Sequence, residues 1–168
     1  MWYEIWTKTG NEEKCKYYID NYIGSEAFIR CVIPTKRISK YIKGRWVKVE
    51  EKLFFSYLFI ESDDIDEFEM QLKNAVTFNK ILKTDNIVLA LDKKDENALC
   101  RLIGDDGIIG ESIGFIDGDN VIVTDGPMVG LEGNIKHIDR HKRLATLEIE
   151  MFDRITEMKL ALEIINKK

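Results

Sequence analysis

The chain has 168 residues, of which 45% are hydrophobic and 33% are charged, and its formal net charge at pH 7 is −5. This composition is typical of a globular protein and argues against intrinsic disorder. The longest apolar run, residues 53–60, is far shorter than the roughly 20 residues that cross a bilayer, so we expect no membrane-spanning segment.

The chain opens with a predicted strand and a predicted amphipathic helix. Residues 2–7 combine aromatic and β-branched side chains, which favours a strand. Gly10 and Asn11 then open a helix with two glutamates in its first turn. Apolar side chains recur at the i, i+3, i+4 and i+7 spacing of one helical face, at Cys15, Tyr18, Ile19 and Tyr22.

Strands and helices continue to alternate after this helix. Residues 27–34 read as a strand, and residues 53–60 as a nearly continuous apolar strand that is covered on both faces and central in its sheet. We expect a second helix capped by Asp63 or Asp64 and a third capped by Asp92. The pattern predicts a mixed α and β domain.

Positive charge gathers in two segments. Residues 36–52 carry seven Lys and Arg against two Glu and are predicted to form an extended hairpin around Lys43 and Gly44. Residues 134–143 carry four Lys and Arg against Asp139, together with both histidines of the chain. Such segments can hold nucleic acid at one face of an acidic protein. The alternative is two solvated hairpins that only improve solubility.

The amino-acid composition of the sequence changes near residue 104. Five glycines and three aspartates fall within residues 104–118, which is typical of linkers and turns. Beyond this segment only short strands are predicted, and about 50 residues of short strands close most economically as a small barrel. The expected strands include residues 121–124, 133–138, 144–151 and 158–162.

Few groups suit metal or catalytic chemistry. Cys15, Cys31 and Cys100 are far apart, and we expect all three to be reduced packing residues. His137 and His141 have the spacing of a zinc-binding helix, but their segment reads as a strand and a turn, so we expect no metal. Without a phosphate-binding glycine motif or a nucleophile–base pair, we expect no cofactor and no enzymatic activity.

Three segments together resemble the NusG family of transcription elongation factors. The first is Trp2-Tyr3-x-x-x-Thr7-x-x-Gly10-x-Glu12, and the second is Leu53-Phe54-Phe55-Ser56-Tyr57-Leu58-Phe59-Ile60. The third is Asp125-Gly126-Pro127-Met128-x-Gly130-x-x-Gly133-x-Ile135-x-x-Ile138-Asp139, which resembles the KOW motif. Phe152-x-Arg154-x-Thr156 is similar to the Phe-Gly-Arg-x-Thr segment that follows the motif in bacterial members.

The resemblance implies an α+β fold with two domains. These are an NGN-type α/β sandwich with an antiparallel sheet over residues 1–103 and a five-stranded SH3-like KOW β-barrel over residues 115–168. Residues 104–114 would form the linker. The sequence also departs from the family, because Phe54-Phe55-Ser56-Tyr57 replaces Phe-Pro-Gly-Tyr and Asp153 replaces glycine. Together with the basic 136–143 segment, these departures make the chain look most like the LoaP-type specialised antiterminators.

Family members bind the clamp helices of RNA polymerase through a concave apolar surface of the first domain. The resemblance implies that Trp6, Phe54 and Tyr57 contribute to this surface here, whereas Leu58 and Phe59 are assigned to packing. The alternative is that Trp6, Phe54 and Tyr57 are all core residues. An exposed aromatic anchor can contribute a few kcal/mol in a desolvated groove.

LoaP-type members recognise an RNA hairpin in a leader transcript, and we expect the basic turn of the barrel to do so here. Its candidate residues are Lys136, His137, Arg140, His141, Lys142 and Arg143. Further nucleic-acid contacts, including non-template DNA, are expected from the first domain at Lys8, Lys14, Arg37, Lys40, Lys43 and Arg45. Phe152, Arg154 and Thr156 match positions where the family's barrel meets NusE or Rho, and Asp153 puts these partners in doubt.

The sequence thus predicts a monomeric antitermination factor that reads through terminators in long operons. Two alternatives stay open: a general NusG that modulates pausing and termination at all genes, and a ribosome-associated RNA-binding protein that carries a KOW barrel. The N-terminus lacks the basic start and apolar stretch of a signal peptide, so we expect the protein to act in the cytoplasm, with no membrane partner.

Overall fold

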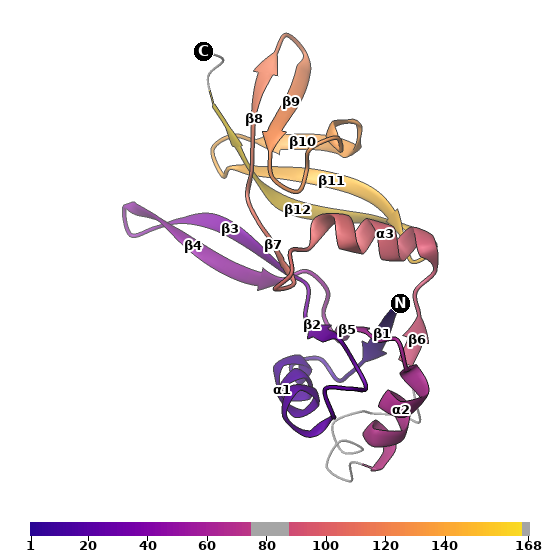
Figure 1. The fold of residues 1–168 in the computed structure, drawn as a ribbon. Helices are drawn as coiled ribbons and strands as arrows, with labels where there is room; N and C mark the ends of the chain where they lie inside the picture. The colour runs from indigo at the N-terminus through magenta and orange to yellow at the C-terminus, as the bar shows by residue number, and fades with distance from the viewer. Residues whose placement is uncertain (75–87, 166–168) are drawn as a thin grey trace. The chain divides into compact units, whose positions relative to one another are not determined.

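The computed structural model describes residues 1–74 and 88–165. It divides into two compact units, each assembled from two stretches of chain (Figure 1). The first unit comprises Met1–Pro34 and Phe54–Glu96, and the second comprises Thr35–Leu53 and Asn97–Lys168. Among the described residues, no helix is long and apolar enough to cross a membrane.

The first unit is built on a four-stranded sheet in the order β2-β5-β1-β6. Its strands are β1 (Trp2–Trp6), β2 (Arg30–Val32), β5 (Tyr57–Glu61) and β6 (Val88–Ala90). The interior position predicted for the apolar strand is confirmed, because β5 pairs antiparallel with both β1 and β2. Leu58, Phe59 and Ile60 are all buried, so both faces of this strand are covered. Residues 53–56 lie outside the strand and form a loop instead.

Helices α1 (Glu12–Tyr22) and α2 (Ile65–Asn74) supply the core of this unit. Cys15 and Ile19 of α1 and Phe68 and Leu72 of α2 belong to one buried cluster with sheet residues such as Ile60. Burial raises the pKa of the Cys15 thiol to about 12 and also raises the pKa of the Cys31 thiol, as expected of packing residues. The same prediction is wrong for Cys100, which is exposed.

Both predicted acidic helix caps are present. Asp64 caps α2, since its Oδ1 accepts a hydrogen bond of 3.1 Å from the Glu67 backbone N–H. Asp92 caps α3 (Lys93–Leu102) in the same way through the Asp95 N–H, at 2.7 Å. Of the two residues predicted as possible caps of this helix, Asp63 and Asp64, it is Asp64 that caps it.

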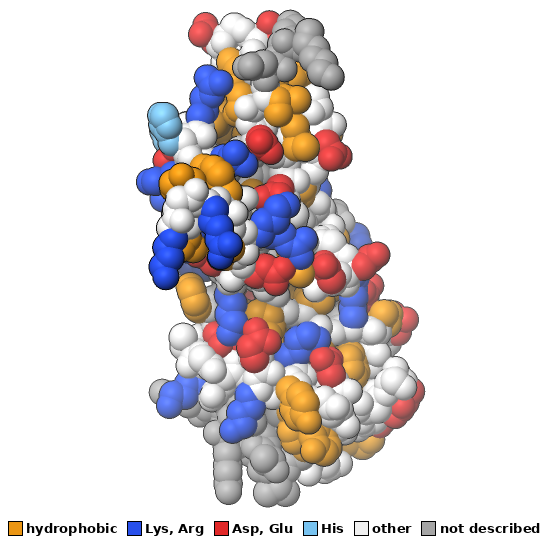
Figure 2. Space-filling model, turned by 90° about the vertical axis from the view of Figure 1, so that its left-hand side faces the viewer, with side chains coloured by type: hydrophobic (Ala, Val, Ile, Leu, Met, Phe, Trp, Pro, Cys, Tyr) orange, Lys and Arg blue, Asp and Glu red, His pale blue; other side chains and the backbone are white. Residues whose placement is uncertain are grey.

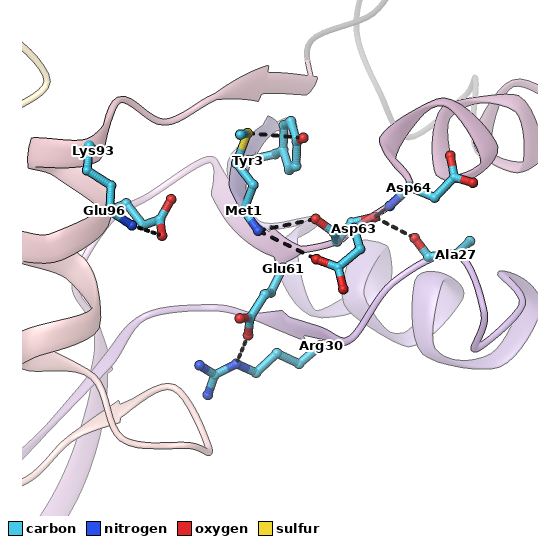
Figure 3. Close-up of polar contacts among 10 residues, drawn as sticks. Met1, Tyr3, Ala27, Arg30, Glu61, Asp63, Asp64, Lys93 and Glu96 are labelled. Carbon is cyan, nitrogen blue, oxygen red and sulfur yellow. Dashed lines mark hydrogen bonds and ion pairs between the residues drawn. The ribbon is translucent and has the colours of Figure 1, made fainter.

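Polar contacts at the C-terminal end of β5 hold the neighbouring segments in place (Figure 3). Arg30 Nε donates to Glu61 Oε2 at 2.6 Å, between residues that face each other across β2 and β5. The Ser62 hydroxyl donates to the Ala27 carbonyl at 2.7 Å and accepts from the Asp64 N–H at 3.0 Å. These bonds connect β5, the start of α2 and the segment before β2, which fixes the register of the sheet.

The basic segment of the second unit forms the predicted hairpin. Strands β3 (Thr35–Ile42) and β4 (Arg45–Lys52) pair antiparallel along their full length. The two turn residues have positive φ, 49° at Lys43 and 81° at Gly44, as a type I′ turn requires. β7 (Ile108–Ile109) adds to β3 in parallel and completes a three-stranded sheet.

The rest of the second unit contains a five-stranded sheet in the order β10-β11-β12-β8-β9. Its strands are β8 (Ser112–Asp117), β9 (Asn120–Asp125), β10 (Ile135–Asp139), β11 (Leu144–Met151) and β12 (Arg154–Ile164), with a short 3₁₀ helix, η2 (Glu132–Asn134), before β10. The expected α+β class with a small five-stranded β domain is confirmed. Residues 104–114, expected as a linker, include β7 and the start of β8.

The loop after β9 is fixed by close backbone packing. Gly126 has φ of 95°, and a Cβ there would lie 2.5 Å from the Glu111 carbonyl oxygen, so only glycine fits. The buried Ser112 hydroxyl accepts a hydrogen bond of 3.1 Å from the Met128 N–H. Met128 is fully buried, and the loop therefore belongs to the core of this sheet.

Candidate functional site

The aromatic residues predicted to bind a partner lie together at one end of the sheet of the first unit. Trp6 and Tyr57 are paired across β1 and β5, and Phe54 lies in the loop before β5, with its ring centroid 6.0 Å from that of Phe59. All three are half-buried, so they are neither core residues nor fully uncovered. Phe55, which the sequence reasoning did not assign to the surface, is 66% exposed. We call Trp6, Phe54, Phe55 and Tyr57 the aromatic surface.

A buried carboxylate holds the loop that presents this surface. Glu12, the first residue of α1, is 0% exposed. Its Oε1 accepts a hydrogen bond of 2.8 Å from the Ser56 N–H, and its Oε2 accepts one of 2.9 Å from the Gly10 N–H. One side chain therefore connects the β1–α1 loop to the aromatic loop, which limits the movement of Phe54 and Phe55.

The backbone at Ser56 supports the same arrangement. The φ of Ser56 is 72°, in the left-handed region that glycine adopts most easily. The motif that this segment resembles has glycine at the position of Ser56. The Ser56 carbonyl accepts from the Thr7 N–H at 2.7 Å, and its hydroxyl is 2.6 Å from that of Thr9. Thr7 itself is fully buried, and its hydroxyl is without a hydrogen-bond partner among the described residues.

The predicted basic turn of the second unit lies where expected, at residues 140–143 between β10 and β11. Asp139 organises it by accepting a hydrogen bond of 2.9 Å from the Lys142 N–H, and this bond holds the pKa of Asp139 below its ordinary value. His137, Arg140, His141 and Lys142 are exposed. Within the described chain, the side chains of His137, Arg140 and His141 make no hydrogen bond or ion pair.

Three candidates in this segment have carboxylate partners inside the protein, although Lys142, whose Nζ lies 3.5 Å from Asp139 Oδ2, stays exposed. Lys136 Nζ lies 3.6 Å from Glu148 Oε2, on the neighbouring strand. Arg143 is half-buried, with φ of 54°, and its Nη1 lies 3.7 Å from Glu163 Oε1. The exposed positive charge of the turn therefore comes mainly from Arg140 and Lys142.

Charge on the β3–β4 hairpin is paired at its base and unpaired at its tip. Arg37 donates to Glu50 through Nε at 3.1 Å and Nη2 at 2.8 Å, and this pairing raises its pKa. Lys40 forms an ion pair with Glu51. Lys43 and Arg45, next to the turn, are exposed and have no ion pair with any described residue.

The remaining basic candidates and the predicted barrel patch are also at the surface. Lys8, in the β1–α1 loop, and Lys14, in α1, are exposed. Phe152 is half-buried and has φ of 55°, as does Asp153, so two non-glycine residues form the β11–β12 turn. Arg154 is exposed, and the half-buried Thr156 hydroxyl is 3.5 Å from the Met151 carbonyl.

Sequence reasoning missed two aromatic residues near the tip of the hairpin. Tyr41 and Trp46 face each other across β3 and β4, with ring centroids 5.4 Å apart, and they are 64% and 39% exposed. The Arg143 guanidinium lies 4.4 Å from the Trp46 ring centroid. Only the alternation of the hairpin strands could have placed the two rings on one face. Figure 2 shows hydrophobic side chains bordered by Lys, Arg and His on this side of the molecule.

Comparison with known proteins gives a consistent result over the whole chain. A family model described as "Transcription termination factor nusG" matches residues 1–101, and one described as "KOW motif" matches residues 118–150. The protein named "Transcription termination/antitermination protein NusG" of Rickettsia typhi is 26% identical over 99% of this chain and 90% of its own length. The protein of the same name from Campylobacter jejuni is 23% identical over 99% and 96%.

A solved structure, titled "Domain interaction in Thermotoga maritima NusG", is similar as well. Its sequence is 21% identical to that of this chain. The match covers 95% of this chain and 92% of the solved chain, and the TM-score is 0.49.

Proposed function

The chain belongs to the NusG family of transcription factors, and from this membership we propose that it is an elongation factor that binds RNA polymerase through the aromatic surface. The observation that carries the proposal is the fixed loop of the first unit. Glu12 and the left-handed Ser56 hold Phe54 half-buried and leave Phe55 66% exposed. Because hydrogen bonds already hold the backbone of this loop, less backbone entropy is lost when a partner helix covers it.

The test is a binding measurement with core RNA polymerase. Phe54→Ala and Tyr57→Ala should each weaken association at least tenfold, since truncating an aromatic anchor at the centre of an interface removes about 2 kcal/mol or more. Tyr17→Ala is the matched control, because Tyr17 lies on α1 in the same unit and is 63% exposed. The proposal fails if the loop variants keep wild-type affinity, or if they lose affinity only together with cooperative unfolding.

We further propose that the basic turn binds an RNA hairpin in a leader transcript, as in LoaP-type antiterminators. Support comes from the exposed cations at Arg140 and Lys142. They can approach phosphates without first breaking a strong ion pair within the protein. Lys142 Nζ is 3.5 Å from Asp139 Oδ2, and because the lysine side chain is 74% exposed, this ion pair contributes little net stability. Arg140→Glu should weaken hairpin binding more than tenfold and flatten its salt dependence.

Arg154→Glu is the control for this test. It makes the same charge change at an exposed arginine of the same unit, beside the β11–β12 turn. Equal losses in the two variants would show that only net charge matters, which would remove the case for a specific RNA site at the β10–β11 turn.

A general NusG role is the second candidate, favoured by the NusG-named relatives that match nearly the full chain. Crosslinking of the protein to transcripts in cells separates the two roles. Uniform occupancy across genes supports the general factor, whereas enrichment on a few long operons supports the specialised one. A protein that binds ribosomes and fails to bind polymerase would instead be a KOW-containing ribosomal factor.

We propose that NusE or Rho binds at Phe152, Arg154 and Thr156, and that this binding is weakened. Asp153 places an exposed carboxylate in the turn between Phe152 and Arg154. A factor with this substitution would bind polymerase while recruiting Rho poorly, which is compatible with antitermination. No covalent step is needed, because about 1.4 kcal/mol against a paused state changes its occupancy tenfold.

A further inference from the structure

We propose that Tyr41 and Trp46 form a stacking site for the unpaired bases of single-stranded RNA. The two rings belong to one face of the β3–β4 hairpin, with centroids 5.4 Å apart and planes tilted by 60°. Tyr41, Ile42 and Trp46 are all exposed near the tip of the hairpin, and neighbouring exposed apolar side chains of this kind can mark an interaction site. Base–aromatic stacking is the usual use of such rings on a basic surface.

Arg143 gives Trp46 a defined orientation. Its guanidinium lies 4.4 Å from the centroid of the indole ring, a cation–π distance. The contact joins the hairpin to the β10–β11 turn within the second unit, so residues far apart in the sequence contribute to one surface. Trp46 nevertheless stays 39% exposed and Tyr41 64% exposed, which leaves ring surface for a base.

The charge around the rings favours a nucleic acid over an apolar protein segment. Residues 40–48 contain Lys40, Lys43, Arg45 and Lys48 and no acidic residue. Two of these four cations are paired, Lys40 with Glu51 and Lys48 with Glu111. Lys43 and Arg45 thus place unpaired positive charge beside the aromatic pair, as a sugar–phosphate backbone requires.

An unpaired strand fits this surface better than a duplex. A duplex hides the faces of its bases, and an A-form RNA helix offers proteins mainly phosphates and 2′-hydroxyls. The inference takes RNA as the ligand from the proposed function, since a nascent transcript is single-stranded when it leaves the polymerase. It extends that function by assigning the unpaired part of the transcript to the hairpin, beside the β10–β11 turn.

The test is a titration of the full chain with an unstructured RNA of about ten nucleotides, long enough to follow the surface. Trp46→Ala and Tyr41→Ala should each weaken binding by about tenfold, because each removes one stacking partner. The slope of log affinity against log salt should not change, because neither variant removes a charge. Ile155→Ala is the control, since it removes an apolar side chain of the same unit that is 71% exposed.

Fluorescence gives a second measurement that does not depend on affinity alone. RNA stacked on Trp46 should quench its emission, and Trp46→Phe should remove this quenching while keeping a ring that still binds. If Trp46→Ala unfolds, Tyr41→Ala and Trp46→Phe test the same site with smaller changes.

Two outcomes would overturn the inference. They are wild-type affinity in the folded Tyr41→Ala and Trp46→Ala variants, and tighter binding of a blunt duplex than of the single strand. Polymerase binding is measured on the same variants and should be unchanged. A chain that stacks RNA but never binds polymerase would refute the proposed function and leave this site standing.

Discussion

Removing the carboxylate of Glu12 should loosen the aromatic surface without altering any of its rings. Glu12→Ala leaves the N–H groups of Gly10 and Ser56 without their acceptor. A buried donor left unsatisfied costs about 1–3 kcal/mol. Since both bonds are only partly buried, we take the low end for each and expect a loss of about 2 kcal/mol of unfolding free energy. That is a large share of the roughly 5–15 kcal/mol that stabilises a domain.

Two further variants separate the hydrogen bonds from the helix-terminal charge. Glu12→Gln keeps one acceptor oxygen and presents an NH₂ group to the other N–H, so it should lose about half as much. Glu13→Ala removes an exposed first-turn glutamate of the same helix, which changes the interaction with the helix dipole by about 0.3–1 kcal/mol.

Urea denaturation in a Trp46→Phe background measures the effect, because the remaining tryptophans, Trp2 and Trp6, both lie in the first unit. Amide exchange at Ser56 should accelerate in Glu12→Ala, and polymerase affinity should fall with it. The reasoning is refuted if the urea midpoint of Glu12→Ala equals that of Glu13→Ala, or if the Ser56 amide stays protected.

Four other substitutions have expected outcomes that can be checked by unfolding measurements. Ser56→Gly should be more stable than Ser56→Ala by about 1 kcal/mol, because both lose the hydroxyl but only glycine relieves the φ of 72°. Thr7→Val should stabilise the protein by about 1 kcal/mol in thermal unfolding, since it replaces a buried hydroxyl that lacks a partner among the described residues. Asp153→Gly should raise stability by about 0.5–1 kcal/mol, because a type I′ turn favours glycine there, and it should strengthen any binding of NusE or Rho measured in parallel. Burial acts to raise the pKa of Glu111, but hydrogen bonds from Lys48 and Ser39 outweigh it and the pKa is lowered. Stability from this carboxylate is therefore present above its unfolded pKa of about 4.5 and is lost as pH falls through the lower folded value. Glu111→Gln should therefore show a smaller loss of urea midpoint as the pH falls below about 4.5.

The elements that depend on local sequence could be predicted, because their signals are local. The Lys43–Gly44 turn, the Asp64 and Asp92 caps and the interior position of Leu58–Ile60 each follow from backbone preference or burial within a few residues. The predicted strand at residues 53–60 was too long at its start. Its first residues are apolar because the loop presents them at the surface, and periodicity cannot distinguish that from burial.

The parts of the candidate sites that escaped prediction depend on contacts between distant residues. Nothing near Glu12 in the sequence shows that its carboxylate would accept from Ser56, 44 residues later. Arg143 was grouped with the exposed cations of its turn, whereas its guanidinium lies over Trp46 of the hairpin. Charge alone identified the basic segments, but pairing with Glu50 and Glu51 decides which cations remain available.

The two proposed binding surfaces place different physical demands on the chain, and their locations fit those demands. The aromatic surface must keep apolar rings partly uncovered, so the first unit holds them on a loop fixed by a buried carboxylate. The surface proposed for RNA, formed by Tyr41 and Trp46, must combine aromatic rings with unpaired positive charge. In the second unit, Arg143 connects the tip of the hairpin to the basic turn. A chain bound to polymerase by the first surface would hold the second at high effective concentration beside the transcript. Modest RNA affinity would then be sufficient for selection, because the tether rather than the stacking energy supplies most of the occupancy.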